Sequence, residues 1–164
     1  MNKAVDSIQE RLTSYACSLN YESLSPEAIH AAKVRTIDTL GALIAGFFAE
    51  PCRIVRNLAA QMPDPHGATV IGTRMKTTPD MAALVNATTA RFPEMTDSYH
   101  WHESPYGGHA SDTLTPVLAA AEHAQISGHD FITGIVLAYE VFCRISDGFH
   151  NRNFDTTNSA CVAT

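Results

Sequence analysis

The fold is decided by the segment SPEAIHAAKVRTIDTLGALIAGFF, residues 25–48. Ser25, Pro26 and Glu27 supply the N-cap, the first-turn proline and the first-turn acid with which helices commonly begin. Apolar side chains then recur every three or four residues up to Phe48, which is the spacing of one helix face. The segment therefore predicts a long helix that is mostly buried near its end.

Two pairs of small residues lie near the end of this helix, Gly41 with Ala45 and Ala42 with Gly46. Side chains this small let the backbone of a neighbouring element approach closely. We therefore expect tight helix packing at this strip and no functional role.

Shorter helices are predicted on both sides of this segment by the same capping and spacing signals. They are expected at residues 4–18, 51–62, 78–92, 111–127 and 130–147, with a further one beginning near residue 159. The turn residues 63–67 are expected to end one helix, and a short strand is expected at 68–71, paired with 74–77. The predicted fold class is all-α, a multi-helix domain with a minor short β element.

Composition and charge exclude several classes of protein. The 164 residues suit one domain, and 45% apolar with 17% charged residues indicate a folded chain. Eleven scattered basic residues against seventeen acidic ones, a net charge of -6, argue against nucleic acid as a partner. The longest apolar run, residues 40–49, is about half a bilayer span, so no membrane partner is expected. Four cysteines without a CxxC pair favour a reducing, cytoplasmic location.

The chemically crowded region is the loop at residues 93–110, together with the helix ends on either side of it. Three of the eight histidines, four carboxylates and the only tryptophan lie there: His100, His102, His109, Glu94, Asp97, Glu103, Asp112 and Trp101. Imidazoles beside carboxylates supply acids and bases that work near neutral pH, and loops held by rigid helices often carry catalytic groups. The competing interpretation is a solvated loop with aromatic anchors.

Two chemistries fit this loop. His100 and His102, completed by Glu103 or His109, could hold zinc or iron in a hydrolase. Alternatively, metal-free acid and base groups could act on a small carboxylate substrate, with Arg91 or a histidine binding the negative charge. The spacing of the residues does not separate the two.

Single residues of the loop have local interpretations as well. Gly107 and Gly108 allow a sharp turn before His109, and a helix N-terminus next to the ring favours a neutral base. Ser111 is expected to cap the following helix, and Asp112 to complement the charge of its N-terminus. Arg91 could bind a substrate carboxylate or pair with Glu94 or Asp97.

Five motifs occur in an order that resembles the MmgE/PrpD family. They are Ser25-Pro26-Glu27 before residues 37–46, the strand 69–72, Asn86 with residues 91–99, residues 108–112, and Ser127-Gly128 before residues 138–144. The resemblance covers about residues 7–164. The family includes 2-methylcitrate dehydratase and cis-aconitate decarboxylase.

The resemblance implies a largely helical domain which, with a separate α+β lid domain, encloses a site for di- and tricarboxylic acids. It implies lyase or isomerase chemistry without a metal or organic cofactor, in which a proton moves next to a carboxylate. It also implies a homodimer and a role in propionate metabolism.

The resemblance carries particular roles to residues of the loop. His109 is the expected site histidine, Glu94 stands where the family usually has its first aspartate, and Asp97 with Ser98 matches the pair that follows. The expected catalytic residues are therefore His109, Glu94 and Asp97. The expected substrate-binding residues are Arg91, Ser98, Tyr99, His100 and His102. Glutamate at 94 reaches one methylene further than aspartate, which leaves the exact substrate open.

Length is the larger departure from the family pattern. Relatives run more than twice as long, and the catalytic lysine and histidine of their lid domain have no counterpart before Thr164. We therefore expect residues 1–164 to be the N-terminal portion of the helical domain, truncated before the lid. The preferred function is proton transfer in a 2-methylcitrate dehydratase-like hydro-lyase. The alternatives are a catalytically inactive remnant or interaction module and, least favoured, the metal-dependent hydrolase.

Overall fold

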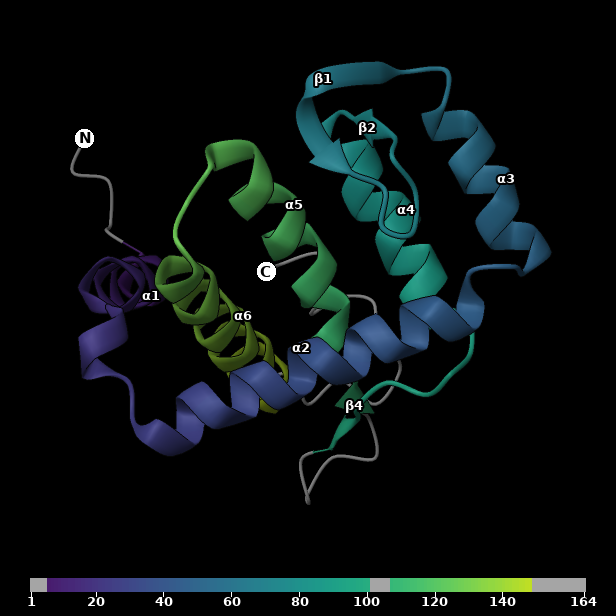
Figure 1. The fold of residues 1–164 in the computed structure, drawn as a ribbon. Coiled ribbons are helices and arrows are strands. Elements are labelled where there is room, and N and C mark those ends of the chain that lie inside the picture. Colours follow the sequence, from purple (N-terminus) through teal and green to yellow (C-terminus); the bar gives the residue numbers. More distant parts are fainter. Residues whose placement is uncertain (1–5, 101–106, 149–164) are drawn as a thin grey trace.

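The fold was analysed in a computed structural model that describes residues 6–100 and 107–148. Helices dominate this part of the chain (Figure 1). The α-helices are α1 (Ser7–Ser18), α2 (Pro26–Gly46), α3 (Glu50–Ala59), α4 (Pro79–Arg91), α5 (Leu114–Ala124) and α6 (Gly128–Gly148). Two short 3-10 helices are η1 (Tyr21–Ser23) and η2 (Ala110–Thr113). The predicted all-α class is confirmed, while the helix expected near residue 159 lies outside the described residues.

The minor β element consists of two short antiparallel pairs. Strand β1 (Pro63–Thr69) pairs with β2 (Lys76–Thr77), and β3 (Tyr99–His100) pairs with β4 (Gly107–Gly108). The prediction that residues 63–67 form only a turn was wrong. Pro63 and Ala68 both lie opposite Thr77, so the residues between them bulge out of the ladder instead of ending it.

Helix α2 begins and packs largely as its sequence predicts. The Ser25 hydroxyl accepts a hydrogen bond from the Ala28 N–H at 3.2 Å, and Pro26 occupies the first turn. One face of α2 packs against α4 and α6. The expectation that its end is mostly buried holds for one face only, because Leu43 and Gly46 are buried while Ile44 is 72% exposed.

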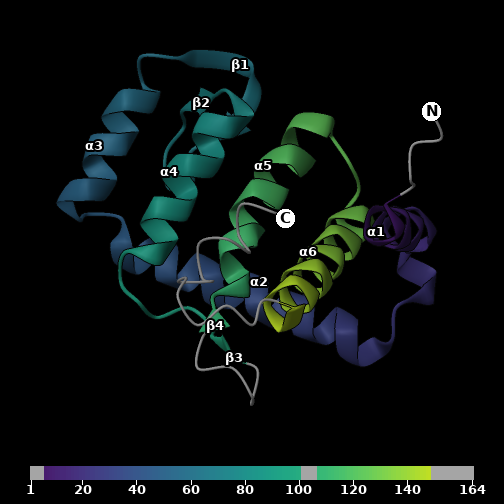
Figure 2. The ribbon, with the colours of Figure 1, turned by 180° about the vertical axis from the view of Figure 1, so that it is seen from behind.

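Three further helices form a layer beside α2. Helices α4, α5 and α6 lie side by side with α5 in the middle, and α2 crosses their ends (Figures 1 and 2). Buried Ala32, Leu114 and Ile135 join α2, α5 and α6 in one core cluster. Fully buried Phe142 of α6 packs on Ala110, the first residue of η2, and so anchors the loop that carries the crowded polar residues.

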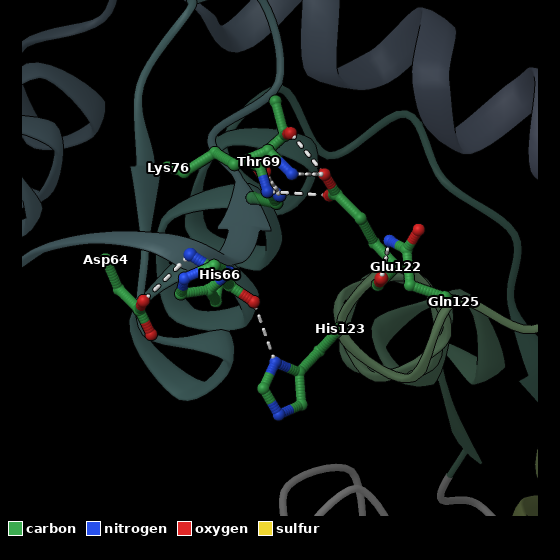
Figure 3. A network of polar contacts seen from close by, with 8 residues as sticks. Asp64, His66, Thr69, Lys76, Glu122, His123 and Gln125 are labelled. Carbon is green, nitrogen blue, oxygen red and sulfur yellow. Dashed lines mark hydrogen bonds and ion pairs between the residues drawn. The ribbon is translucent and has the colours of Figure 1, made fainter.

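A polar network ties the β element to α5 (Figure 3). The Glu122 carboxylate accepts hydrogen bonds from the Thr69 N–H and hydroxyl, both at 2.6 Å, and lies 2.9 Å from Lys76 Nζ. Burial alone would raise the pKa of Glu122, but the hydrogen bonds from Thr69 and Lys76 outweigh it and lower the pKa below its ordinary 4.5. The ionised carboxylate therefore stabilises the fold.

Replacing Glu122 by glutamine is expected to lower the free energy of unfolding at pH 7 by about 1–2 kcal/mol. The pKa is lower in the folded state, so this stability is present above about 4.5 and disappears as the pH falls through the folded-state value. Urea unfolding of both proteins from pH 7 to pH 3 measures the difference. The control is Glu140→Gln, which removes a more exposed i,i+4 pair with Arg144. If the loss of unfolding free energy caused by Glu122→Gln stayed constant between pH 7 and pH 3, the ion-pair explanation would be contradicted.

None of the helices in the described ranges 6–100 and 107–148 is both long and apolar enough to cross a bilayer.

Candidate functional site

His109 is held by the backbone of Asp97. Its Nδ1 atom lies 2.5 Å from the Asp97 carbonyl oxygen and 3.5 Å from the Thr96 hydroxyl. A carbonyl oxygen can only accept, so Nδ1 carries the proton of this hydrogen bond. In the neutral ring the lone pair then belongs to Nε2. In this tautomer Nε2 of the half-buried imidazole is the nitrogen that can accept a proton, and the predicted role of His109 as a catalytic base stays a prediction.

Asp97 holds this arrangement through its side chain. The carboxylate is only 8% exposed, its Oδ1 accepts a hydrogen bond from the Ser111 N–H at 3.1 Å, and its Oδ2 lies 3.9 Å from Arg35 Nε. Both oxygens therefore face groups of the fold, while the backbone carbonyl of the same residue holds His109. The structure favours a positioning role for Asp97, and its predicted part in proton transfer stays a prediction.

Arg91 lies between two carboxylates at the end of α4. Its Nη1 is 2.7 Å from Glu94 Oε2, and its Nε is 3.4 Å from Asp112 Oδ1. Of the two roles considered for Arg91, pairing with Glu94 is thus observed, and Asp112 of η2 is the second partner. Arg91 is 29% exposed and Glu94 68%, so this ion pair borders solvent.

Glu94 is placed by an uncommon backbone conformation. Its φ of 50° lies in the left-handed region, where a residue with a Cβ atom is strained. The hydrogen bond from Arg91 lowers the pKa of Glu94, and the positive charge of Arg91 lowers it further; a protonated His109 would act in the same direction. Glu94 is therefore ionised at neutral pH and lies within electrostatic reach of the imidazole.

The helix start after His109 differs from the prediction. Residues 110–113 form η2 before α5 begins, and the N-cap position of η2 is His109. The prediction that Ser111 is the cap was wrong, because its side chain is buried inside the 3-10 turn and its hydroxyl has no hydrogen-bond partner among the residues that the structure describes. Asp112 lies in the first turn and pairs with Arg91.

Two of the expected substrate-binding residues line a cavity of about 320 Å³ between α2 and α6. Ser98 and Tyr99 share its wall with Asp97, Arg35 and Tyr139. The Tyr99 hydroxyl donates to Asp147 Oδ1 at 2.7 Å, and this bond raises the pKa of Tyr99 to about 12. His109, Arg91 and Glu94 are not part of this wall. Asp97 connects the two sets of residues, because its side chain lines the cavity and its backbone carbonyl holds His109.

A family model for the MmgE/PrpD N-terminal domain matches residues 10–164, which is nearly the whole chain. The chain belongs to the MmgE/PrpD family. Residues 10–164 match its N-terminal domain, and the chain is therefore a member of a dehydratase-type family. The resemblance inferred from five ordered motifs is confirmed.

The structure of this MmgE/PrpD domain describes only some of the residues that the sequence suggested as metal ligands. Within residues 6–100 and 107–148, no three His, Cys, Asp or Glu side chains are grouped so as to hold a metal ion. His102, Glu103 and the side chain of His100 lie outside the described residues. Their predicted roles, as metal ligands or in substrate binding, stay predictions.

Two residues near the site were not predicted as site residues, although Tyr139 lies within the motif at residues 138–144. Arg35 lies on α2 and Tyr139 on α6, both far along the chain from Asp97, yet all three line one cavity. Each sits within an ordinary helical pattern, so no local spacing distinguishes it from a surface or core residue. Only the crossing of α2 and α6 brings them to the loop.

Proposed function

We propose that this MmgE/PrpD chain supplies the base of a cofactor-independent hydro-lyase that acts on a small di- or tricarboxylic acid. The observation that carries the proposal is the hydrogen bond between His109 Nδ1 and the Asp97 carbonyl, which leaves Nε2 as a neutral base. Membership of a dehydratase-type family supports the reaction class. A homodimer, a cytoplasmic location and a role in propionate metabolism remain part of this proposal.

The chemistry follows from the placement of His109. Nε2 removes a proton from the carbon next to a substrate carboxylate, and the electron pair of the broken C–H bond passes into the enediolate of that carboxylate. The enediolate then forms the carbon–carbon double bond and expels the β-hydroxyl group, which takes the proton from His109 and leaves as water. The imidazole returns to its neutral form, so protons and electrons balance within the site.

Arg91 is the cation that can stabilise the negative charge of the enediolate. It is paired with two carboxylates, of which Glu94 is the more exposed. A substrate carboxylate can replace Glu94 on the guanidinium group, since such an exchange trades one ion pair for another. Because Glu94 is ionised, it repels an anionic substrate until it moves away, which favours exchange of the pair over simple addition.

Hydrogen–deuterium exchange tests the proton removal directly. The chain is incubated in D₂O with 2-methylcitrate or cis-aconitate, and proton NMR follows the loss of signal next to the carboxylates, while alkene absorbance follows dehydration. We expect exchange at one carbon of a polycarboxylate. Exchange only by a longer form of the chain that carries a lid domain would favour the inactive remnant or interaction module. Exchange by neither form would overturn the proposal.

A further inference from the structure

The Asp97 carboxylate has few partners for a charge that is almost buried. A carboxylate offers about four acceptor positions. In the described part of the chain Asp97 has one good hydrogen bond, from the Ser111 N–H at 3.1 Å, and one long contact, to Arg35 Nε at 3.9 Å. Burying an ionised group with so few donors is unfavourable, so a further donor is needed.

The Tyr139 hydroxyl group, at the same cavity, can donate a hydrogen bond that the Asp97 carboxylate could accept. This hydroxyl group is buried, and no atom within residues 6–100 and 107–148 forms a well-aligned hydrogen bond with it. Tyr139 lines the cavity that Asp97 and Arg35 also line. Burial raises the pKa of Tyr139, and the adjacent Asp97 carboxylate raises it further, so the phenol stays protonated and able to donate.

We propose that Tyr139 is a positioning residue whose hydroxyl donates to the Asp97 carboxylate and so holds the peptide that orients His109. The two groups are complementary, because the carboxylate has acceptor positions left and the protonated hydroxyl, whose pKa the Asp97 carboxylate raises through a side-chain hydrogen bond, can donate to one of them. The Ser111 N–H, the Arg35 guanidinium group and the Tyr139 hydroxyl then surround Asp97 from η2, α2 and α6. The catalytic consequence rests on the proposed function, but the contact itself does not.

The competing explanation is that Tyr139 is a core residue with an unpaired hydroxyl. The two explanations predict opposite effects for Tyr139→Phe. Removing a buried hydroxyl that has no partner leaves stability unchanged or raises it, whereas removing a donor from a buried carboxylate lowers it.

Thermal unfolding separates these outcomes. We expect Tyr139→Phe to lower the unfolding midpoint at pH 7 by about 2–4 °C. In an Asp97→Asn background the same substitution is expected to have a much smaller effect, because the charged acceptor is gone. Tyr15→Phe is the matched control, since it removes the hydroxyl of a partly exposed tyrosine on α1. An unchanged or higher midpoint in Tyr139→Phe would overturn the proposal.

Nitrogen-15 NMR of the histidine rings tests the effect on His109. The His109 signals are assigned by their loss in His109→Gln, and the wild type is expected to show the Nδ1–H tautomer. In Tyr139→Phe the fraction of the Nε2–H tautomer should rise several-fold, while Tyr15→Phe should leave it unchanged. A folded Tyr139→Phe protein with a wild-type tautomer ratio would show that Tyr139 has no positioning role. This readout needs no turnover, so a failed exchange assay would remove the proposed function without removing this contact.

Discussion

Replacing His109 by glutamine is expected to lower the rate of substrate deuteration at least about a hundredfold. Glutamine has nearly the size of histidine and can still donate an amide N–H to the Asp97 carbonyl, so the loop should keep its shape. Its amide group has no basic lone pair, so nothing replaces Nε2. The exchange assay measures the effect at saturating substrate, where the loss should appear in kcat rather than in KM.

His123 supplies the matched control for this substitution. Its Nδ1 also faces a backbone carbonyl, that of His66 at 3.0 Å, but the residue is exposed and lies in the last turn of α5 (Figure 3). His123→Gln should therefore exchange substrate protons at the wild-type rate. Equal losses in both variants would point to a general structural effect, and no loss in His109→Gln would exclude His109 as the base.

Replacing Gly46 by alanine is expected to lower the free energy of unfolding by about 3 kcal/mol. A Cβ atom at this position would overlap the backbone carbonyl oxygen of Thr89 and would lie 3.2 Å from Pro93 Cδ. Neither a carbonyl group inside α4 nor a proline ring can turn aside, so α2 and α4 would have to separate. Urea unfolding measures the loss, which is large for a single methyl group because α2 and α4 are in close contact at this position.

Gly41 of the same helix is the matched control. A Cβ atom there meets nothing within 4 Å. Gly41→Ala should therefore stabilise the chain by about 0.5–1 kcal/mol, because alanine loses less conformational freedom than glycine when the helix forms. If the two substitutions changed stability by the same amount, close packing at Gly46 would not be the explanation.

The sequence predicts the helices well, because capping residues and apolar spacing act within a few residues. Ser25 and Pro26 start α2 as expected, and the predicted centres of α3, α4, α5 and α6 lie inside the observed helices. The errors occur where distant contacts decide the outcome. Ile44 fits the apolar period of α2 but is 72% exposed, since periodicity indicates an amphipathic helix without showing how much of the apolar stripe a neighbour covers.

The candidate site was predicted in part, as a loop rich in histidines and carboxylates. The pairing of Arg91 with Glu94 was one of the alternatives weighed, since the two are close in the sequence. The hydrogen bond from His109 to the Asp97 carbonyl was not predictable, because any of several loop backbones could have met the ring. Arg35 and Tyr139 reach Asp97 only through the crossing of α2 and α6.

The sequence alone determined that this chain forms helices around a polar loop and belongs to the MmgE/PrpD family, because these properties depend on the order and spacing of residues. The tertiary structure decided which of the two pairs of small residues in α2 packs against neighbouring helices. Ala42 and Gly46 are buried, whereas Gly41 and Ala45 face solvent. The pairs have the same spacing and similar size, so only the position of α4 distinguishes them. The same reason applies to His109, whose tautomer is determined by a carbonyl group that folding brings to it.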